Sequence, residues 1–425
     1  DVYKKQVFGI KELWGIDFFW IAAIGLVVLT ALYTIFGGMK SVLYTSVLQT
    51  PILLLGSLII LVLGFKELGG WDEMMRVCGA VTVNDYGDTM TNLIRSNDDA
   101  NFPWLGALIG SAIIGFWYWC TDQFIVQRVL SGKNEKEARR GTIFGAYLKL
   151  LPVFLFLIPG MIAFALHQKY IGAGGEGFLP MLANGTANAD AAFPTLVAKL
   201  LPAGVKGLVV CGILAALMSS LASLFNSSAM LFTIDFYKRF RPETPEKKLV
   251  GIGQIATVVI VILGILWIPI MRSVGDVLYT YLQDVQSVLA PGIAAAFLLG
   301  ICWKRTSAQG GMWGLIAGMI IGLTRLGAKV YYSNAGEVAD STFKYLFYDM
   351  NWLFFCGWMF LFCIIVVIVV SLATEAPTAE KIQGLVFGTA TKEQKAATRA
   401  SWDHWDIIHT VIILAITGAF YWYFW

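Results

Sequence analysis

Polar side chains interrupt an apolar stretch of the chain near residue 120. The run 116–123, FWYWCTDQ, combines aromatic rings with a carboxylate and an amide. Polar groups at membrane depth are costly unless they face a bundle interior or a wet cavity, so they typically mark a solute or ion path. Alternatively, Asp122 and Gln123 only tie helices together. Tyr118 and Trp119 are candidates for the apolar wall against which a hydroxyl-rich ring stacks.

A second polar cluster lies at 218–228, MSSLASLFNSS. Ser219 and Ser223 are four residues apart and share a helix face. Hydroxyl groups and backbone carbonyls are ligands that a small hard cation accepts. Small residues also let helices pack closely, so for Ser219 and Ser220 both interpretations stay open. Ser227 and Ser228 are interpreted as packing residues.

Two further places combine polar groups with apolar surroundings. Lys149 lies one turn before Pro152, and Gln283, Asp284 and Gln286 fall within one turn. These groups are suited to hydrogen-bonding a hydroxyl-rich solute. We nevertheless interpret Asp284 as the partner of a lysine and Gln286 as a helix contact. Motifs such as HExxH, GxSxG and the phosphate loop do not occur, so the sequence does not indicate an enzyme.

These residues must be positioned by membrane-spanning helices. Hydrophobic residues make up 57% of the 425, charged residues only 14%, and the mean hydropathy is +0.69. This composition predicts an integral, all-α polytopic membrane protein. The net charge of +3 leaves no electrostatic footprint for nucleic acid. The six cysteines form no CxxC. Five of them fall in apolar runs and are interpreted as core residues rather than as a metal or disulfide framework: Cys120, Cys211, Cys302, Cys356 and Cys363.

Apolar windows long enough to cross a bilayer predict ten transmembrane helices. They lie near 18–37, 42–65, 104–130, 141–166, 205–236, 249–271, 274–303, 311–330, 351–374 and 407–425. Lysine and arginine gather in the loops around 133–140, 238–248, 304–305 and 381–399, which predicts that these loops are cytoplasmic. The pairs Gly37-Gly38 and Gly310-Gly311 are interpreted as tight turns at helix ends.

Several segments, in order along the chain, strongly resemble the sodium/glucose cotransporter branch of the solute:sodium symporter family. They are LYTIFGGMKS at 32–41, FWYWCTDQFIVQR at 116–128, GAYLKLLP at 145–152, ALMSSLASLFNSS at 216–228, YLQ at 281–283 and PGIAAAFLLGICWKR at 291–305. The WYWC and YLKL segments are the ones that resemble the sugar-transporting branch.

The resemblance implies a leucine-transporter-type fold, in which two inverted repeats enclose a site at the middle of the membrane. The whole chain, 1–425, is then one transmembrane domain. It comprises the end of the first repeat (17–70), the second repeat (104–305) and additional C-terminal helices (310–425). The chain opens with Asp1 rather than Met, and we expect about four helices to precede it in the complete protein. Alone, it would present about half a binding site and be unable to transport.

The resemblance also implies roles for particular residues. The sodium ligands would be the backbone carbonyls of Ala216 and Ser219 with the hydroxyls of Ser219 and Ser220. The sugar would be contacted by Lys149, Ser223 and Gln283, with Tyr118 as the inner gate and Trp119 beside it. Gly115 stands where family members place an Asn or Thr that contacts sugar, and Asp122 and Gln123 are left with a bracing role.

One departure bears on ion stoichiometry. The family's usual YTD reads Tyr44-Thr45-Ser46, and Ala222 replaces the hydroxyl residue that completes a second sodium site. We therefore predict one sodium per sugar. With about 2.3 kcal/mol per 100 mV and about 1.4 kcal/mol per tenfold gradient, one ion supports roughly 500-fold accumulation. Because single-sodium relatives also carry the Asp, Ser46 is alternatively a residue that alters ion release.

The sequence thus predicts an alternating-access sodium:sugar symporter that imports a hexose such as galactose or glucose. Its partners would be sodium, a monosaccharide and the lipid bilayer of a cell membrane, taken to be a bacterial inner membrane. One alternative is a sodium-coupled symporter of myo-inositol or another polyol. A second is a sodium-gated sugar sensor or leak channel.

Overall fold

The computed structural model describes residues 12–13, 15–182, 185–272, 278–334 and 339–425. The described chain is predominantly helical, and its two strands, β1 (Glu12–Leu13) and β2 (Ile16–Asp17), form a short antiparallel pair that places Leu13 opposite Ile16. Two compact units divide the chain, one comprising 1–82, 89–91 and 148–277 and the other 83–88, 92–147 and 278–425.

The first unit is built on the packing of α1 against α8. Its helices are α1 (Phe18–Leu68), α2 (Trp71–Gly79), α6 (Ile158–Gly172), α7 (Ala192–Leu200), α8 (Ala203–Met230), α9 (Lys238–Phe240) and α10 (Glu246–Arg272), with π-helical turns at Val153–Leu157 and Leu231–Tyr237 and a 3-10 turn, η3, at Ala189–Ala191. A Cβ added at Gly56 would lie 2.4 Å from Val209, so the glycine is what allows α1 to approach α8. Ile60 and Ile162 are fully buried in the same core.

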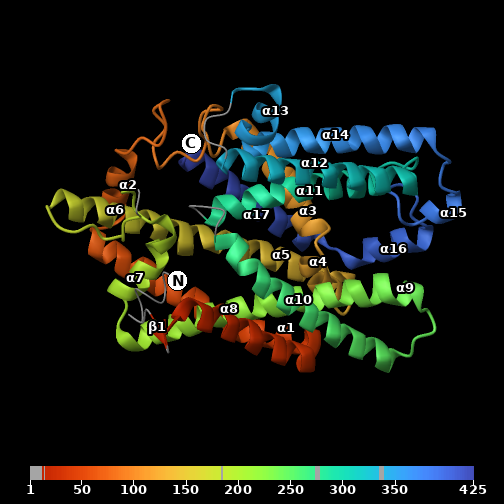
Figure 1. Ribbon diagram of the computed structural model, residues 1–425, viewed down its shortest axis with the longest axis horizontal. Coiled ribbons are helices and arrows are strands. Elements are labelled where there is room, and N and C mark those ends of the chain that lie inside the picture. Colours follow the sequence, from red (N-terminus) through yellow and green to blue (C-terminus); the bar gives the residue numbers. More distant parts are fainter. Residues whose placement is uncertain (1–11, 14, 183–184, 273–277, 335–338) are drawn as a thin grey trace. The chain divides into compact units, whose positions relative to one another are not determined.

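The second unit is built on α11, α12 and α14, each of which packs against the other two (Figure 1). Its helices are α3 (Trp104–Cys120), α4 (Gln123–Leu130), α11 (Leu278–Cys302), α12 (Ala308–Asn334), α13 (Thr342–Lys344), α14 (Trp352–Ala373), α15 (Ala379–Ile382), α16 (Lys392–Ser401) and α17 (His404–Tyr423), with a π-helical turn, η5, at Tyr345–Asp349. The helix α5 (Glu135–Pro152) begins in this unit and ends in the first.

The membrane spans agree with the predicted windows except at the start. Eight described helices are long and apolar enough to cross a bilayer, or nine when the bent pair α3 and α4 is counted as one span. The remaining predicted window corresponds to the shorter apolar stretch Phe19–Ile35 within α1. The start of the window 274–303 lies outside the described residues.

Both predicted glycine turns are wrong. Gly37 and Gly38 lie inside α1, which continues as a helix from Phe18 to Leu68. Glycine lowers helix stability by about 1 kcal/mol, but Met39 and Lys40, which follow the pair, are strong helix formers. Gly310 lies inside α12, where a Cβ would meet Ser371 Oγ at 2.1 Å. This glycine therefore provides close packing between α12 and α14.

The polar run at 116–123 contains a helix break. The helix α3 ends at Cys120, α4 begins at Gln123, and the two are bent by 49°. Asp122 caps α4 by accepting the N–H of Phe124 at 3.1 Å, and Thr121 Oγ1 donates to the Trp117 carbonyl at 2.7 Å. The bracing role predicted for Asp122 is thus realised as a helix N-cap.

Candidate functional site

The serine cluster of α8 faces α1 within the first unit. Ser219 and Ser223 are 6% and 0% exposed, whereas Ser220 is exposed. The hydroxyls of Ser219 and Ser46 lie 2.5 Å apart and form a hydrogen bond. Tyr33 of the same neighbouring helix donates its hydroxyl to the Met218 carbonyl at 2.8 Å. Of the predicted sodium ligands, Ser219 therefore belongs to a polar contact between two apolar helices.

A cavity of about 390 Å³ opens beside this contact. Ala216 and Ser220 line it from α8, four residues apart on one helix face, and Asp190 of η3 contributes a carboxylate. The other lining residues are mostly apolar: Leu53, Phe156, Phe193, Pro194, Ile213 and Leu217. An accessible hydroxyl, a neighbouring helical turn and one carboxylate in an open, mostly apolar cavity are chemically suited to a small monovalent cation.

Lys149 and Ser223 also belong to the first unit. Lys149 is exposed near the end of α5, three residues before Pro152, and the chain continues through the π-helical turn Val153–Leu157 into α6. Pro159 lacks the N–H that would bond the Leu155 carbonyl, which accounts for the irregular turn that precedes it. Ser223 is fully buried on α8.

Tyr118, Trp119 and Gln283 belong to the second unit. The rings of Tyr118 and Trp119 meet edge to face, with centroids 5.2 Å apart, and Trp119 is 50% exposed. Gln283 is partly exposed on α11 and donates its amide to the Tyr279 hydroxyl at 3.0 Å. The predicted sugar-contacting residues are thus shared between the two units, and their assembly into one site stays a prediction.

The interpretation of Asp284 as the partner of a lysine is confirmed. Its carboxylate contacts the Lys329 ammonium, and Arg325 approaches the other carboxylate oxygen at 3.6 Å. Arg325 and Lys329 were not among the residues predicted from the sequence. The signal that could have identified them is the presence of two cations one turn apart in the otherwise apolar window 311–330, because buried charges require partners.

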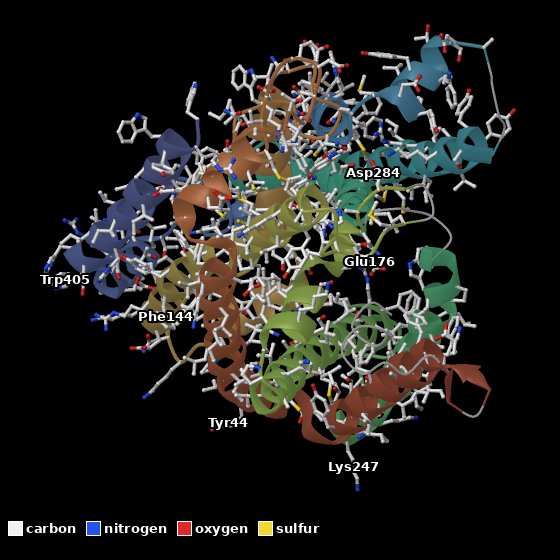
Figure 2. The ribbon with its side chains drawn as sticks, turned by 90° about the vertical axis from the view of Figure 1, so that its left-hand side faces the viewer. Tyr44, Phe144, Glu176, Lys247, Asp284 and Trp405 are labelled. Atoms are coloured by element: carbon white, nitrogen blue, oxygen red, sulfur yellow. The ribbon has the colours of Figure 1, made fainter. Side chains whose placement is uncertain are left out.

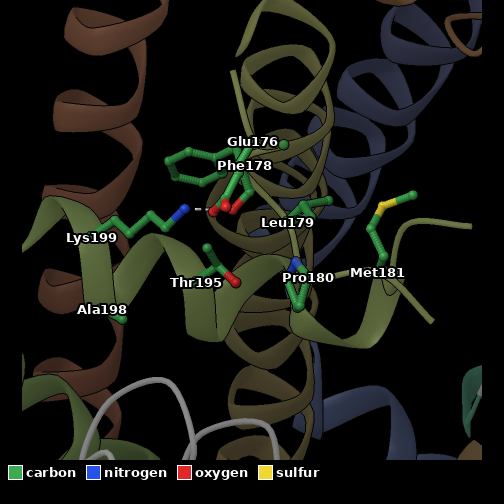
Figure 3. A pocket seen from close by; sticks show the side chains of 9 residues that line it. Glu176, Phe178, Leu179, Pro180, Met181, Thr195, Ala198 and Lys199 are labelled. Atoms are coloured by element: carbon green, nitrogen blue, oxygen red, sulfur yellow. Dashed lines mark hydrogen bonds between the residues drawn. The ribbon is translucent and has the colours of Figure 1, made fainter. Parts of the chain in front are cut away.

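A larger cavity, of about 610 Å³, lies in the first unit between the segment 176–181 and the C-terminal half of α7, and was not predicted (Figure 3). In it the Lys199 amine donates to the Phe178 carbonyl at 2.8 Å and lies over the Phe178 ring. Burial lowers the pKa of Lys199, an effect that Glu176 opposes. Because the Lys199 amine is already bonded to backbone, we assign this cavity no solute.

A polar loop in the second unit holds two carboxylates. Asp99 accepts the N–H groups of Asn101 and Phe102 at 2.9 and 2.8 Å, and Asn84 bridges Asp88 and Asp99 at 2.7 and 3.0 Å. Burial raises the pKa of Asp99, but these hydrogen bonds outweigh it and hold the pKa below its usual range. Arg95 of the same loop approaches Asp99 at 3.6 Å. These carboxylates organise the loop, since their described contacts are to its own backbone, to Asn84 and to Arg95.

Comparison of the chain with known proteins identifies its family. The family model for the sodium:solute symporter family matches residues 7–322. The sodium/myo-inositol cotransporter 2 of Homo sapiens is 35% identical over 400 residues, and the sodium/glucose cotransporter 1 of Ovis aries is 37% identical over 391 residues. These alignments cover 92% and 88% of this chain, but only 59% of each relative. The chain therefore spans about three fifths of their length.

A longer match is to the sodium/mannose cotransporter of Bos taurus, which is 35% identical over 427 residues covering 96% of this chain and 72% of that protein. Among solved structures, the substrate-bound outward-open state of a Na+-coupled sialic acid symporter superposes with a TM-score of 0.65 at 21% identity, covering 89% of this chain and 71% of that one. This likeness confirms the predicted all-α, leucine-transporter-type fold of a multi-pass membrane protein. The chain belongs to the sodium:solute symporter family, whose members are transporters rather than enzymes.

Proposed function

We propose that the complete gene product is a sodium:sugar symporter, which uses the sodium gradient to import a hexose such as galactose or glucose by alternating access. The relatives named above are cotransporters of sodium with glucose, mannose or myo-inositol. The segments that resemble the sugar-transporting branch, at 116–128 and 145–152, lie within the matched region 7–322.

The observation that carries the proposal is the environment of the α8 hydroxyls. Ser219 is buried against Ser46, while Ala216 and Ser220 line a cavity that also contains Asp190. For packing alone, small apolar residues would suffice, and an exposed hydroxyl in a cavity that a carboxylate also lines is the kind of group that an ion path needs. In the proposed site the carbonyls of Ala216 and Ser219 and the hydroxyls of Ser219 and Ser220 hold sodium.

We assign the sugar contacts to Lys149, Ser223 and Gln283, with Tyr118 as inner gate and Trp119 beside it. Partial exposure of Trp119 and Gln283, and exposure of Lys149, support this assignment because a contact residue must be reachable by solute. Ser223, which is fully buried, requires a movement of neighbouring side chains to reach a sugar.

We also propose a stoichiometry of one sodium per sugar. Ser46 carries no charge, and Ala222, at the position of the second-site hydroxyl, is fully buried without a polar group. A second cation would therefore lack both the carboxylate and the hydroxyl that the two-ion members provide. One sodium supports roughly 500-fold accumulation at 100 mV and a tenfold gradient.

A second candidate is a sodium-coupled symporter of myo-inositol or another polyol, which the myo-inositol relative favours. A ring hydroxyl differs between such solutes by a hydrogen bond or two, so the same residues suit both. Competition against labelled galactose by glucose, mannose and myo-inositol decides between them. A sodium-gated sensor or leak channel would allow equilibration but no accumulation.

The ion site is tested by replacing Ser220 with Ala in the complete gene product. Losing one hydroxyl from a desolvated cation costs at least about 1.4 kcal/mol, so the half-saturating sodium concentration should rise about tenfold. Ser228→Ala, one of the hydroxyls assigned to packing, is the matched control on the same helix. If the parent and Ser220→Ala require the same sodium concentration for activation, the ion-site proposal is wrong and these serines serve only in helix packing.

Gln283→Ala tests the sugar site in the same uptake measurement. It should raise the half-saturating sugar concentration several-fold, because a polar group of the sugar loses its partner. Gln286→Ala on the same helix is the control, since that side chain is assigned to helix contacts. Unchanged sugar dependence in Gln283→Ala would remove this residue from the site.

A further inference from the structure

Asp284 lies at the centre of a buried ionic cluster in the second unit, where it is labelled in Figure 2. Its side chain is 12% exposed, and it bridges two cations of α12, with Lys329 on one carboxylate oxygen and Arg325 at 3.6 Å on the other. Arg325 is 0% exposed, and the Lys329 side chain is 33% exposed. Such a cluster fixes the outer part of α11 to α12, because moving either helix separates buried opposite charges.

Arg325 is anchored independently of Asp284. Its guanidinium donates to the Met350 carbonyl at 2.8 Å and lies 4.0 Å above the Phe355 ring. It also donates to the Leu346 carbonyl of η5 at 3.5 Å, so it is fixed to η5 and α14 as well as to its own helix. Asp284 consequently contacts a cation whose position is set by three elements of the unit. Through this contact, Arg325 fixes the position of α11.

Closer to the C-terminal end of α11, α11 and α12 meet backbone to backbone. A Cβ added at Gly322 would lie 2.7 Å from the Val288 carbonyl, and one added at Gly318 would lie 3.0 Å from the Cα of Gly292. Pro291 lacks the N–H that would bond the Ser287 carbonyl, which weakens the helix next to this contact. One turn before Val288, the two helices are bridged instead by charged side chains, those of Asp284 on α11 and of Arg325 and Lys329 on α12.

Gln283 directly precedes Asp284 on the same turn. Successive residues of an α-helix are rotated by about 100°, so a carboxylate fixed toward α12 determines the direction in which Gln283 points. Gln283 itself bonds only within α11, through the Tyr279 hydroxyl at 3.0 Å in the described contacts. Its placement toward any solute therefore follows from the rotation and height of the turn that Asp284 fixes.

We propose that Asp284, with Lys329 and Arg325, is a positioning device that sets the Gln283 amide for sugar binding. This inference rests on the proposed function, in which Gln283 contacts the sugar. Lys329 is the residue through which it is best tested. The cluster holds two cations and one carboxylate, so removing Lys329 leaves a neutral Asp284–Arg325 pair. Removing Asp284 instead would leave two cations unpaired and endanger folding.

The experiment compares Lys329→Gln, Lys329→Arg and the parent in the complete gene product, by sodium-driven uptake of labelled galactose or glucose. Lys329→Gln should raise the half-saturating sugar concentration about fivefold, which corresponds to about 1 kcal/mol. The maximal rate per transporter and the half-saturating sodium concentration should change less than about twofold. Lys329→Arg keeps the charge and should restore sugar dependence.

Lys344→Gln is the matched control. Lys344 pairs with Asp340 at 2.9 Å on an exposed part of the same unit, away from α11, so its loss should leave sugar dependence unchanged. A double-mutant cycle with Gln283→Ala provides the decisive readout. If Lys329 acts through Gln283, adding Lys329→Gln to Gln283→Ala should raise the half-saturating sugar concentration no further.

Three results would overturn the inference while leaving the proposed function intact, provided that the parent shows sodium-dependent uptake. In the first, Lys329→Gln lowers only the amount of transporter or its maximal rate. In the second, Lys329→Gln raises the half-saturating sugar concentration by the same factor with and without Gln283. In the third, Gln283→Ala itself leaves the half-saturating sugar concentration unchanged. Absence of sodium-dependent uptake in the parent would overturn the proposed function, and this inference with it.

Discussion

The hydrogen bond between Ser46 and Ser219 makes a sharp prediction about sodium affinity. Ser219 is 6% exposed, and its hydroxyl lies 2.5 Å from that of Ser46. If this bond orients Ser219 so that a lone pair faces sodium, Ser46→Ala removes the orientation. The loss of one such hydrogen bond costs about 1 kcal/mol. The half-saturating sodium concentration should then rise about fivefold, since 1.4 kcal/mol corresponds to a factor of ten.

The assay is uptake of labelled sugar as a function of sodium at fixed membrane potential, with the complete gene product. Ser46→Thr retains the hydroxyl and should stay close to the parent. Thr50→Ala is the matched control, because Thr50 lies one turn away on α1 and donates to the Ser46 carbonyl at 2.9 Å rather than to Ser219. Parental sodium activation in Ser46→Ala would refute the reasoning that this contact orients a sodium ligand.

Two further predictions concern the scaffold. Gly310→Ala should destabilise the protein by about 1–3 kcal/mol, because its Cβ would lie 2.1 Å from Ser371 Oγ and 2.9 Å from the Val367 carbonyl, whereas Gly311→Ala has open space and should be neutral or stabilising in thermal unfolding. Equal melting temperatures for the two would contradict this. The lowered pKa of Asp99 means that its contribution to loop stability is present above the unfolded carboxyl pKa of about 3.9 and is lost as pH falls through the folded value. Protection of the Asn101 and Phe102 amides, corrected for intrinsic exchange, should therefore fall as the pH is lowered below about 4 in the parent but not in Asp99→Asn. Protection in the parent that does not change with pH would count against it.

Much of the helical organisation could be predicted. The length of an apolar window follows from the thickness of the bilayer, and charged residues flank the windows because charge is costly in the hydrocarbon. The helix ends were predicted less well. A glycine pair is compatible with a turn, as we expected at Gly37-Gly38 and Gly310-Gly311, and equally with close helix packing. Only the position of a neighbour such as Ser371 distinguishes the two.

The candidate site shows the same division. The hydroxyls of α8 were identifiable by their density in an apolar helix, and a lysine partner for Asp284 follows from the cost of an unpaired buried carboxylate. The sequence does not indicate which lysine this is, because Lys329 lies 45 residues away from Asp284. The contact of Arg325 with the other carboxylate oxygen likewise depends on how α12 packs against α11. The contact between Ser46 and Ser219, separated by 173 residues, likewise depends on the packing of α1 against α8.

The most direct test of the central claim is uptake of labelled galactose or glucose into vesicles that contain the complete gene product. We predict that an inward sodium gradient drives the internal sugar concentration above the external one, and that replacing sodium with potassium or choline abolishes this accumulation. Accumulation driven by a proton gradient without sodium, or sodium-dependent equilibration that never exceeds the external concentration, would contradict it.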